Sequence, residues 1–376
     1  MTDTVGLIAG EASGDLLGAE LVRALKSRHP ELQFEGIAGP RMVEAGARAL
    51  ASCERLSVNG YVEVLRHLPD LLKLRRQTVD HFLASQPRVF VGIDAPDFNF
   101  GVEARLKAAG IPAVHFVSPS IWAWRGERIH KIRKSVSHML VVFPFEAEIY
   151  RQAGIPVSYV GHPMADRLPL EPDTAAARQA LGIEVTGPVI ALLPGSRRGE
   201  VGRLAPLMLA AAKQILKSRP SVQFLIPAAT EAVEAGLREL AGASGLPVRV
   251  LRGQSHAAMT AADVVVLASG TATLEAALLK KPMVITYRVP AITAWLARRK
   301  LYLPYVGLPN ILLKRFAVPE LLQENATPKN LAREVLTWLD SPEQCAALAS
   351  EFRALHETLR CNAGERIAEA LEPYLN

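Results

Sequence analysis

The stretch "VVVLASGTATLEAALLKKPMVITYR", residues 264–288, joins two apolar runs through a glycine turn and a helical pattern. Neither apolar run carries a charged residue, as is typical of strands buried on both faces of a parallel sheet. A strand, a helix and a second strand of this kind predict a βαβ unit. The stretch therefore places the chain in the α/β class.

The same alternation of strands and helices extends along most of the chain and predicts two Rossmann-like, doubly wound domains. The pattern restarts after a polar, proline-bearing stretch at 164–187, and a length of 376 residues also favours two domains. We expect an N-terminal domain over 1–165, a second domain over 186–316 and a helical tail over 317–376. A cleft is expected between the two domains.

Composition narrows the class of protein. Lys and Arg number 43 against 37 Asp and Glu, a formal charge of +6 that suits anionic partners such as nucleotides or an anionic membrane surface. Cys53, Cys345 and Cys361 are far apart, which argues against a disulfide framework and a zinc site. We see neither a signal peptide nor an apolar run long enough to span a membrane, so we expect a cytoplasmic protein.

Loops that follow strands are where a doubly wound sheet binds its ligands. In the quoted stretch, Ser269, Gly270, Thr271, Ala272 and Thr273 follow a strand and begin a helix. Their N–H groups and hydroxyls form an anion site at the positive end of the helix dipole, and Glu275 can accept hydrogen bonds from a ribose. Simple Ser/Thr capping with Glu as partner is the alternative. When this helix start is considered with the "ALLPGSRRGEV" loop of the same domain, binding of a nucleotide diphosphate is the better interpretation.

That other loop is "ALLPGSRRGEV". Gly195 and Ser196 let the main chain turn closely past a ligand, and Arg197 and Arg198 supply cations for phosphate. The spacing is not that of a Walker A loop, and a simple basic turn is the alternative.

Two loops of the first domain carry acidic groups. In "FVGIDAPDFNF", Asp94 directly follows a strand, where a carboxylate can act as a general base toward a substrate hydroxyl. Asp97 fits a helix N-cap better, although we place it with the sugar site. In "LIAGEASGDLLGAEL", Glu11, Ser13 and Gly14 precede a helix, but GxGxxG is absent. We assign these three residues to an acceptor or donor sugar, with a tight turn and an N-cap as the alternative.

An amphipathic stretch, "NGYVEVLRHLPDLLKLRR", has the composition of an interfacial element. Its apolar side chains recur near helical spacing and basic residues flank them. An ordinary helix packed on its own sheet explains the pattern equally well. The expected membrane contacts are Val64, Leu65, Leu68, Leu71 and Leu72.

Eight motifs in order resemble the lipid-A-disaccharide synthase family, glycosyltransferases of lipid A assembly in Gram-negative bacteria. The resemblance runs from about residue 6 to residue 366. The motifs are "AGEASGD", "GIDAPDFN", "SPSIWAWR", "VGHPMAD", "LLPGSR", "LASGTATLE", "YVGLPN" and "RCNAGE". Ala12 and the additional Arg198 are departures that touch no residue given a role.

The resemblance implies a GT-B fold, no metal and no cofactor. It implies transfer from UDP-2,3-diacylglucosamine to 2,3-diacylglucosamine 1-phosphate, which forms a β-1,6-linked disaccharide and UDP. The family's essential acid corresponds to Asp94. Its UDP contacts correspond to Ser196, Arg197, Gly270–Thr273, Glu275 and Asn310.

The resemblance also implies where the protein works. Both substrates are acylated, so we expect peripheral association with the cytoplasmic face of the inner membrane. Family members can form a homodimer that exchanges C-terminal segments, which places Asn310 within reach of a partner's site.

Two rival functions remain open. A UDP-sugar epimerase shares the two-domain fold and a helix-end diphosphate site but needs no acyl acceptor. An RNA-binding or nucleotide-sensing protein is suggested only by the basic charge, by the paired arginines Arg197 and Arg198 and by the tryptophan-rich basic block at 117–138. We expect no nucleic-acid partner, because that basic theme is not repeated elsewhere.

Overall fold

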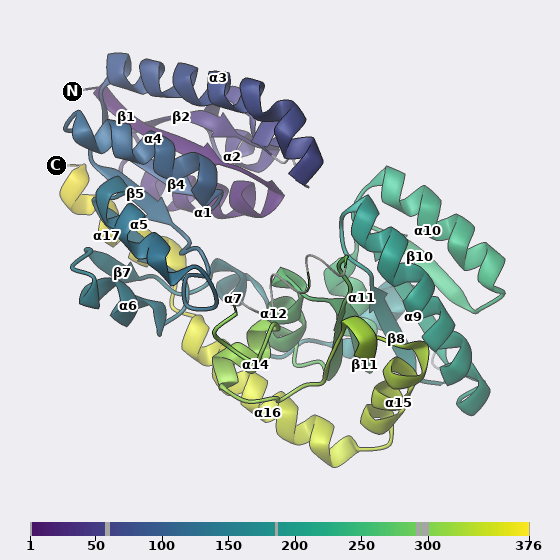
Figure 1. The fold of residues 1–376 in the computed structure, drawn as a ribbon. Coiled ribbons are helices and arrows are strands. Elements are labelled where there is room, and N and C mark those ends of the chain that lie inside the picture. The colour runs from purple at the N-terminus through teal and green to yellow at the C-terminus, as the bar shows by residue number, and fades with distance from the viewer. Residues whose placement is uncertain (1, 57–60, 185–186, 291–293, 295–300, 376) are drawn as a thin grey trace. The chain divides into compact units, whose positions relative to one another are not determined.

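The structure is a computed structural model that describes residues 2–56, 61–184, 187–290, 294 and 301–375, with the side chains of residues 2 and 61–66 left out of the description. The chain divides into two compact units. Unit 1 combines Met1–Asp166 with Leu359–Asn376, and unit 2 is Arg167–Thr358. Each unit is a parallel sheet with helices on its faces (Figure 1).

Unit 1 is built on a seven-stranded parallel sheet in the order β3-β2-β1-β4-β5-β6-β7. The chain first adds strands on one side of β1 and then continues on the other side with β4, so the strand order reverses between β1 and β4. The strands are β1 (Thr2–Ala9), β2 (Gln33–Ala38), β3 (Ala47–Ser52), β4 (Pro87–Ile93), β5 (Ala113–Phe116), β6 (His138–Val141) and β7 (Val157–Tyr159).

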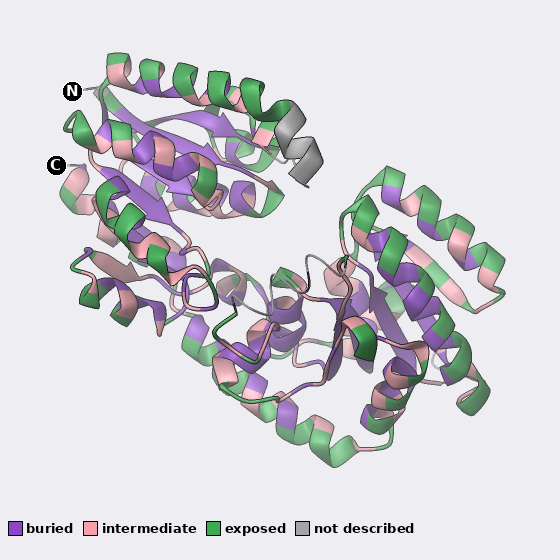
Figure 2. Ribbon diagram, in the orientation of Figure 1, coloured by how far each residue is buried: buried purple, intermediate pink, exposed green. Residues whose placement is uncertain are grey.

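The helices of unit 1 bury one face against this sheet and expose the other (Figure 2). Phe82 of α3 meets Phe90 of β4 with ring centroids 5.3 Å apart, inside a core cluster that extends to α4. The helices are α1 (Ala12–Arg28), α2 (Pro40–Glu44), α3 (Tyr61–Ser85), α4 (Pro96–Ala108), α5 (Ile129–Ser135), α6 (Glu146–Gln152), α7 (Pro163–Arg167) and α17 (Ala363–Leu371), with 3-10 turns η1 (Cys53–Leu56), η2 (Gly126–Arg128) and η4 (Glu372–Tyr374).

The last helix returns to unit 1 through two of the motifs noted in the sequence. Asp166 of "VGHPMAD" accepts hydrogen bonds from the N–H groups of Asn362 and Ala363 in "RCNAGE", at 2.9 and 2.6 Å. These bonds satisfy two of the free N–H groups at the start of α17. The two motifs therefore hold the C-terminal helix in place within unit 1.

Unit 2 contains a six-stranded parallel sheet in the order β10-β9-β8-β11-β12-β13. Its strand order reverses between β8 and β11. The strands are β8 (Val189–Leu193), β9 (Gln223–Ala228), β10 (Val248–Arg252), β11 (Val264–Ala268), β12 (Met283–Tyr287) and β13 (Glu320–Leu322).

Helices cover both faces of this second sheet as well (Figure 1). Trp338 of α15 is buried and donates from Nε1 to the carbonyl of Met283 at 3.2 Å. The helices are α8 (Thr174–Ala180), α9 (Arg198–Ser218), α10 (Glu231–Ser244), α11 (Ser255–Ala261), α12 (Thr271–Leu278), α14 (Leu308–Leu313), α15 (Pro328–Leu339) and α16 (Pro342–Leu359), with the turn η3 (Gln323–Asn325).

The expected fold class, α/β with two doubly wound sheets, is confirmed. The expectation of an entirely helical segment after residue 317 is wrong at β13, which pairs with β12 through Ile285 and Glu320. Three residues are too few to show a strand pattern. Among the described residues, no helix is both long enough and apolar enough to cross a membrane.

Candidate functional site

The loops after β1 and β4 lie against each other, at the point where the strand order of unit 1 reverses. Ala9 and Ile93 are paired at the ends of these strands. A Cβ atom built on Gly10 would lie 2.3 Å from the Cβ of Ala95, so this contact requires glycine. Such a reversal is the usual ligand site of an open α/β sheet.

Asp94, the predicted base, is half-buried on a turn whose main chain is held at both ends. Asp94 has a φ of 52° and Ala95 a φ of 42°, left-handed values that are uncommon for residues other than glycine. The N–H of Asp94 donates to the carbonyl of Phe116 at 2.9 Å, and its own carbonyl accepts from Nδ2 of Asn99 at 2.8 Å. Strained turns that their surroundings hold in this way cluster at functional sites.

The residues predicted for a sugar site lie around the same strand ends. Glu11 is the N-cap residue of α1, Ser13 is exposed in its first turn, and Gly14 is buried. Asp97 is exposed, and its Oδ1 accepts a hydrogen bond from Arg128 at 2.7 Å. Asp97 thereby links the start of α4 to η2, a contact that the sequence did not predict.

A buried carboxyl holds the "SPSIWAWR" loop, which follows β5. Glu146 accepts from Nε1 of Trp122 and from the N–H of Phe143, both at 3.0 Å. Burial raises the pKa of Glu146 to about 7, although the hydrogen bonds that it accepts act in the opposite direction. The hydroxyls of Ser118 and Tyr150 lie 2.7 Å apart and fix the start of the same loop.

The tip of this loop presents an aromatic ring beside cations. Trp124 is exposed, and the guanidinium carbon of Arg125 lies 4.2 Å from its ring centroid. Arg125 has a left-handed φ of 53°, which turns the chain at this point. An exposed tryptophan with an arginine on its face suits a sugar ring or a lipid headgroup region.

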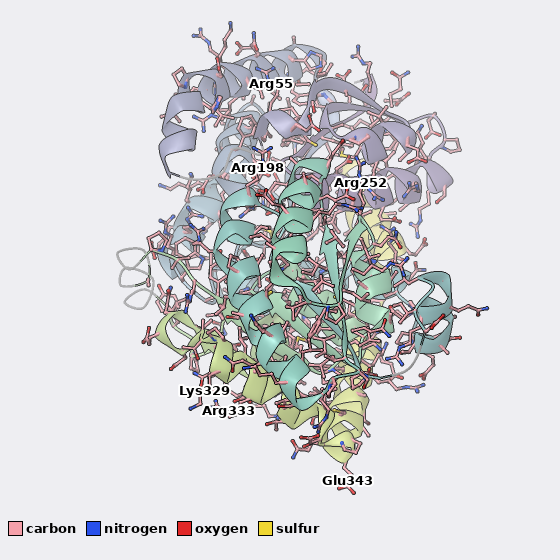
Figure 3. All side chains as sticks on the ribbon, turned by 90° about the vertical axis from the view of Figure 1, so that its right-hand side faces the viewer. Arg55, Arg198, Arg252, Lys329, Arg333 and Glu343 are labelled. Atoms are coloured by element: carbon pink, nitrogen blue, oxygen red, sulfur yellow. The ribbon has the colours of Figure 1, made fainter. Side chains whose placement is uncertain are left out.

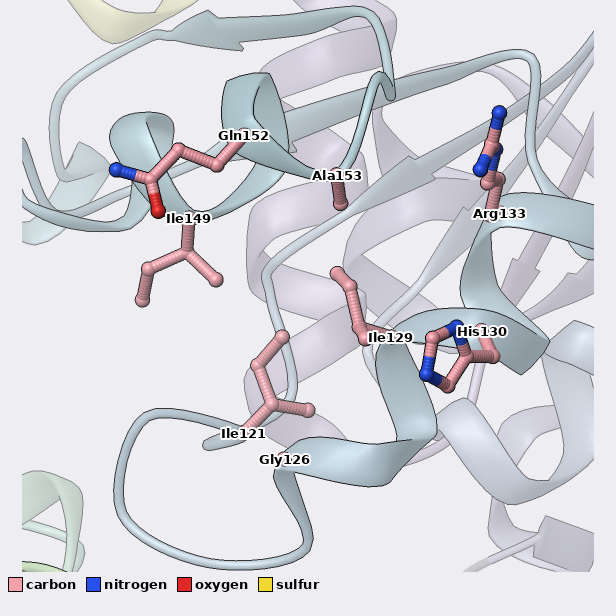
Figure 4. A pocket seen from close by; sticks show the side chains of 8 residues that line it. All are labelled: Ile121, Gly126, Ile129, His130, Arg133, Ile149, Gln152 and Ala153. Carbon is pink, nitrogen blue, oxygen red and sulfur yellow. The ribbon is translucent and has the colours of Figure 1, made fainter.

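A separate pocket of about 430 Å³ lies between α5 and α6. Figure 4 shows Ile121, Ile129 and Ile149 extending toward its interior, whereas Arg133 and Gln152 lie at its edges. None of the residues predicted for the site lines this pocket.

In unit 2, the loops after β8 and β11 also lie where the strand order reverses. Leu193 of β8 pairs with Leu267 of β11, so the "PGSR" and "SGTAT" loops leave neighbouring strands. Ser196 and Arg197 are exposed just before α9. Figure 3 shows Arg198 at the start of α9 and Arg252 at the end of β10.

The start of α12 is open on its outer side. Gly270 has a φ of 150°, and a Cβ built there would meet no atom within 4 Å, so glycine permits this backbone and leaves the helix start uncovered. The exposed residues Gly270 and Thr271, with Ala272, bring first-turn N–H groups to the surface. Thr273 is buried, and its hydroxyl donates to the carbonyl of Gly270 at 2.7 Å. Thr273 thus shapes the turn.

Glu275 has a partner that the sequence did not predict. Its Oε2 lies 2.9 Å from Nε2 of His256, which belongs to α11. His256 follows the loop after β10, so the rule used for the other loops identifies its position, although not its contact with Glu275.

Asn310 lies inside unit 2. It is fully buried, its Nδ2 donates to the carbonyl of Val318 and to Oε1 of Glu320, and its Oδ1 accepts from the N–H of Val318. Glu320 also accepts from the N–H groups of Val306 and Gly307, both at 2.9 Å. Asn310 therefore helps to fix the turn next to α12, and its contact with a nucleotide stays a prediction.

The expected membrane contacts are only partly described. Leu68 and Leu72 of α3 are 40% and 45% exposed, and Leu71 is half-buried. The side chains of Val64 and Leu65 lie outside the described residues. For metals, no group of three or more His, Cys, Asp and Glu suited to hold an ion occurs in the part of the chain that the structure describes.

Comparison with known proteins identifies the family. A family model described as lipid-A-disaccharide synthetase matches residues 5–371. The chain belongs to the lipid-A-disaccharide synthase family. It is similar to the lipid-A-disaccharide synthase of Thiobacillus denitrificans, with 62% identity over 98% of this chain and 99% of the relative. The corresponding protein of Methylobacillus flagellatus is 56% identical, over 99% of each chain.

Solved structures support the fold. The UDP-GlcNAc 2-epimerase from Neisseria meningitidis bound to UDP-GlcNAc has a TM-score of 0.64 at 15% identity, covering 98% of this chain and all of that one. A glycotransferase of kitacinnamycin has a TM-score of 0.66 at 16% identity, with 99% of each chain covered. Family membership makes this chain a glycosyltransferase of lipid A disaccharide synthesis.

Proposed function

We propose that the protein transfers 2,3-diacylglucosamine from UDP to the 6-hydroxyl of 2,3-diacylglucosamine 1-phosphate, with inversion at the anomeric carbon. The single observation that carries this proposal is Asp94, a half-buried carboxylate held on a strained turn where the strand order of unit 1 reverses. A rigidly held base at such a site suits removal of a proton from a bound hydroxyl.

In the proposed step, Asp94 accepts the proton of the acceptor's 6-hydroxyl. The oxygen of that hydroxyl attacks the anomeric carbon of the donor at the same time. The bond from that carbon to the phosphate oxygen breaks, and its electron pair leaves with UDP. One displacement inverts the configuration and gives the β-linked disaccharide 1-phosphate.

We assign the leaving UDP to unit 2. Negative charge grows on the phosphate oxygen as the bond breaks, and fixed donors at that place lower the barrier. The open first turn of α12 at Gly270–Ala272 and the exposed Arg197 and Ser196 are suited to this task. Glu275 is assigned to the ribose hydroxyls, with His256 beside it.

Acylated substrates require contact with a lipid surface. We propose that α3 provides it at the inner membrane through Leu68 and Leu72, which are exposed on a helix that also carries Lys73 and Arg76. A homodimer that exchanges C-terminal segments stays a prediction. In the structure, α17 packs on α1 of the same chain, where Glu365 pairs with Arg28.

The family match disfavours the UDP-sugar epimerase that the sequence left open, because the epimerases among the solved structures are only 14–15% identical and share the fold alone. UDP release from UDP-2,3-diacylglucosamine should be followed with and without the acceptor, in the presence of a chelator. We expect release that depends on the acceptor. Isomerisation of the nucleotide sugar without acceptor would overturn the proposal.

A further inference from the structure

Three buried polar side chains lie directly behind the turn of Asp94. Asn99, Glu103 and His115 have no exposed surface. Nδ1 of His115 lies 2.7 Å from Oε1 of Glu103. Among the described residues, Oδ1 of Asn99, Oε2 of Glu103 and Nε2 of His115 are buried without a hydrogen-bond partner. Buried polar atoms without hydrogen-bond partners lower the stability of a fold. The presence of this cluster therefore needs an explanation other than stability.

Gly92 makes room for this cluster. It pairs with His115 across β4 and β5, so the two residues face the same side of the sheet. A Cβ on Gly92 would lie 2.1 Å from Oε1 of Glu103 and 3.0 Å from Cγ of Asn99. The absent side chain therefore lets Glu103 reach across β4 to His115.

The Glu103–His115 hydrogen bond joins the two elements that hold Asp94. Asn99, one turn before Glu103 on α4, donates to the carbonyl of Asp94. Phe116, next to His115 on β5, accepts from the N–H of Asp94. Any shift of α4 along β5 would move these two bonds relative to each other.

We propose that Glu103 and His115 form a buried positioning pair that locks α4 to β5 and so holds Asp94 for the reaction. This inference rests on the proposed function. Burial raises the pKa of Glu103, and among the described residues neither buried group has a second hydrogen-bond partner. Phe100 covers the imidazole, with ring centroids 4.6 Å apart.

The test compares variants that break the hydrogen bond with one that keeps it. Glu103→Leu removes the bond. Gly92→Ala displaces the carboxyl without changing either partner, although its Cβ also crowds Asn99. Glu103→Gln keeps the shape and an oxygen that accepts from the imidazole. Val102→Ala, on the same helix but in the core cluster of Phe82 and Phe90, is the control for loss of packing.

We expect Glu103→Leu and Gly92→Ala to lower kcat at least tenfold with KM for the UDP-sugar within twofold, per folded molecule. Glu103→Gln should stay within threefold of the wild type. Val102→Ala should lower Tm without a comparable loss of kcat.

An unchanged kcat in both Glu103→Leu and Gly92→Ala would overturn the positioning pair. A loss of kcat in Val102→Ala as large as in a bond-breaking variant of similar Tm would overturn it too. A loss in Glu103→Gln as large as in Glu103→Leu would overturn it as well. If the wild type itself shows no acceptor-dependent UDP release, the proposed function fails instead.

Discussion

Gly10 and Ala95 are in contact across the carboxyl ends of β1 and β4, so closely that a Cβ on Gly10 would lie 2.3 Å from the Cβ of Ala95. The loop of Glu11 and the turn of Asp94 therefore share one packing contact. A side chain at residue 10 would therefore push the two loops apart.

A Gly10→Ala variant should separate these loops and lower kcat by about tenfold or more, because small displacements of a catalytic group cost large factors in rate. The double variant Gly10→Ala/Ala95→Gly should recover most of the loss, since it removes the opposing Cβ at a left-handed position where glycine is favoured. Steady-state kinetics on folded protein measures both.

Gly236→Ala is the control for the glycine substitution itself, because its Cβ would meet no atom within 4 Å on the helix α10. It should leave kcat unchanged. No recovery in the double variant would show that the contact between Gly10 and Ala95 does not hold the site.

Arg197 and Arg198 offer a matched pair for the phosphate site. Arg197→Ala should weaken UDP binding by about 10- to 100-fold, the range for loss of hydrogen bonds between charged groups. Arg198→Ala should change the Kd by less than threefold, because the family resemblance places Arg197 and not the additional Arg198 at the UDP. Calorimetric titration with UDP distinguishes them, and equal losses would contradict the assignment.

Glu146 should make the stability of the fold depend on pH near neutrality. Its pKa is about 7 in the folded protein and about 4.5 when exposed, so the folded state keeps a proton that the unfolded state loses. The free energy of unfolding should therefore fall as pH rises from about 4.5 to 7, by roughly 3 kcal/mol in total.

Glu146→Gln replaces the titrating carboxyl by a neutral amide, so the free energy of unfolding should change less with pH between about 4.5 and 7. Urea unfolding at several pH values measures it, with Glu148→Gln, an exposed neighbour on α6, as the control. Parallel curves for the wild type and Glu146→Gln would show that the buried carboxyl does not titrate in this range.

The membrane proposal predicts a loss of lipid binding without unfolding. Leu68→Ser/Leu72→Ser should weaken binding to phosphatidylglycerol vesicles by about tenfold or more, since two exposed apolar side chains no longer enter the interface. Vesicle sedimentation and a thermal melt test this. Val43→Ser/Leu50→Ser, which changes two similarly exposed residues of unit 1, is the control. An equal loss in both double variants would count against α3.

The sequence predicted the position of those candidate residues that directly follow a strand, and their roles stay predictions. Asp94 in unit 1, and Arg197 and Gly270 in unit 2, each stand in such a loop, because parallel topology places these loops at the carboxyl ends of the strands in their own sheet. The fold class followed from the uncharged strand patterns for the same reason.

Other features depend on contacts between distant residues, which no local pattern reveals. The sequence pattern gives no special role to Asn99, Glu103 and His115, because their contacts form only when α4 packs on β4 and β5. His256 becomes a candidate only because its side chain contacts Glu275. Asn310 is buried among the groups that it bonds, Val318 and Glu320.

The central claim is that Asp94 removes the proton in the transfer step, and Asp94→Asn tests it most directly. UDP affinity and acceptor-dependent UDP release should be measured on the same preparation of the folded variant. We predict an unchanged Kd for UDP and a loss of turnover of about 10²- to 10⁴-fold, the range for removal of a general base. Turnover close to that of the wild type would contradict the account.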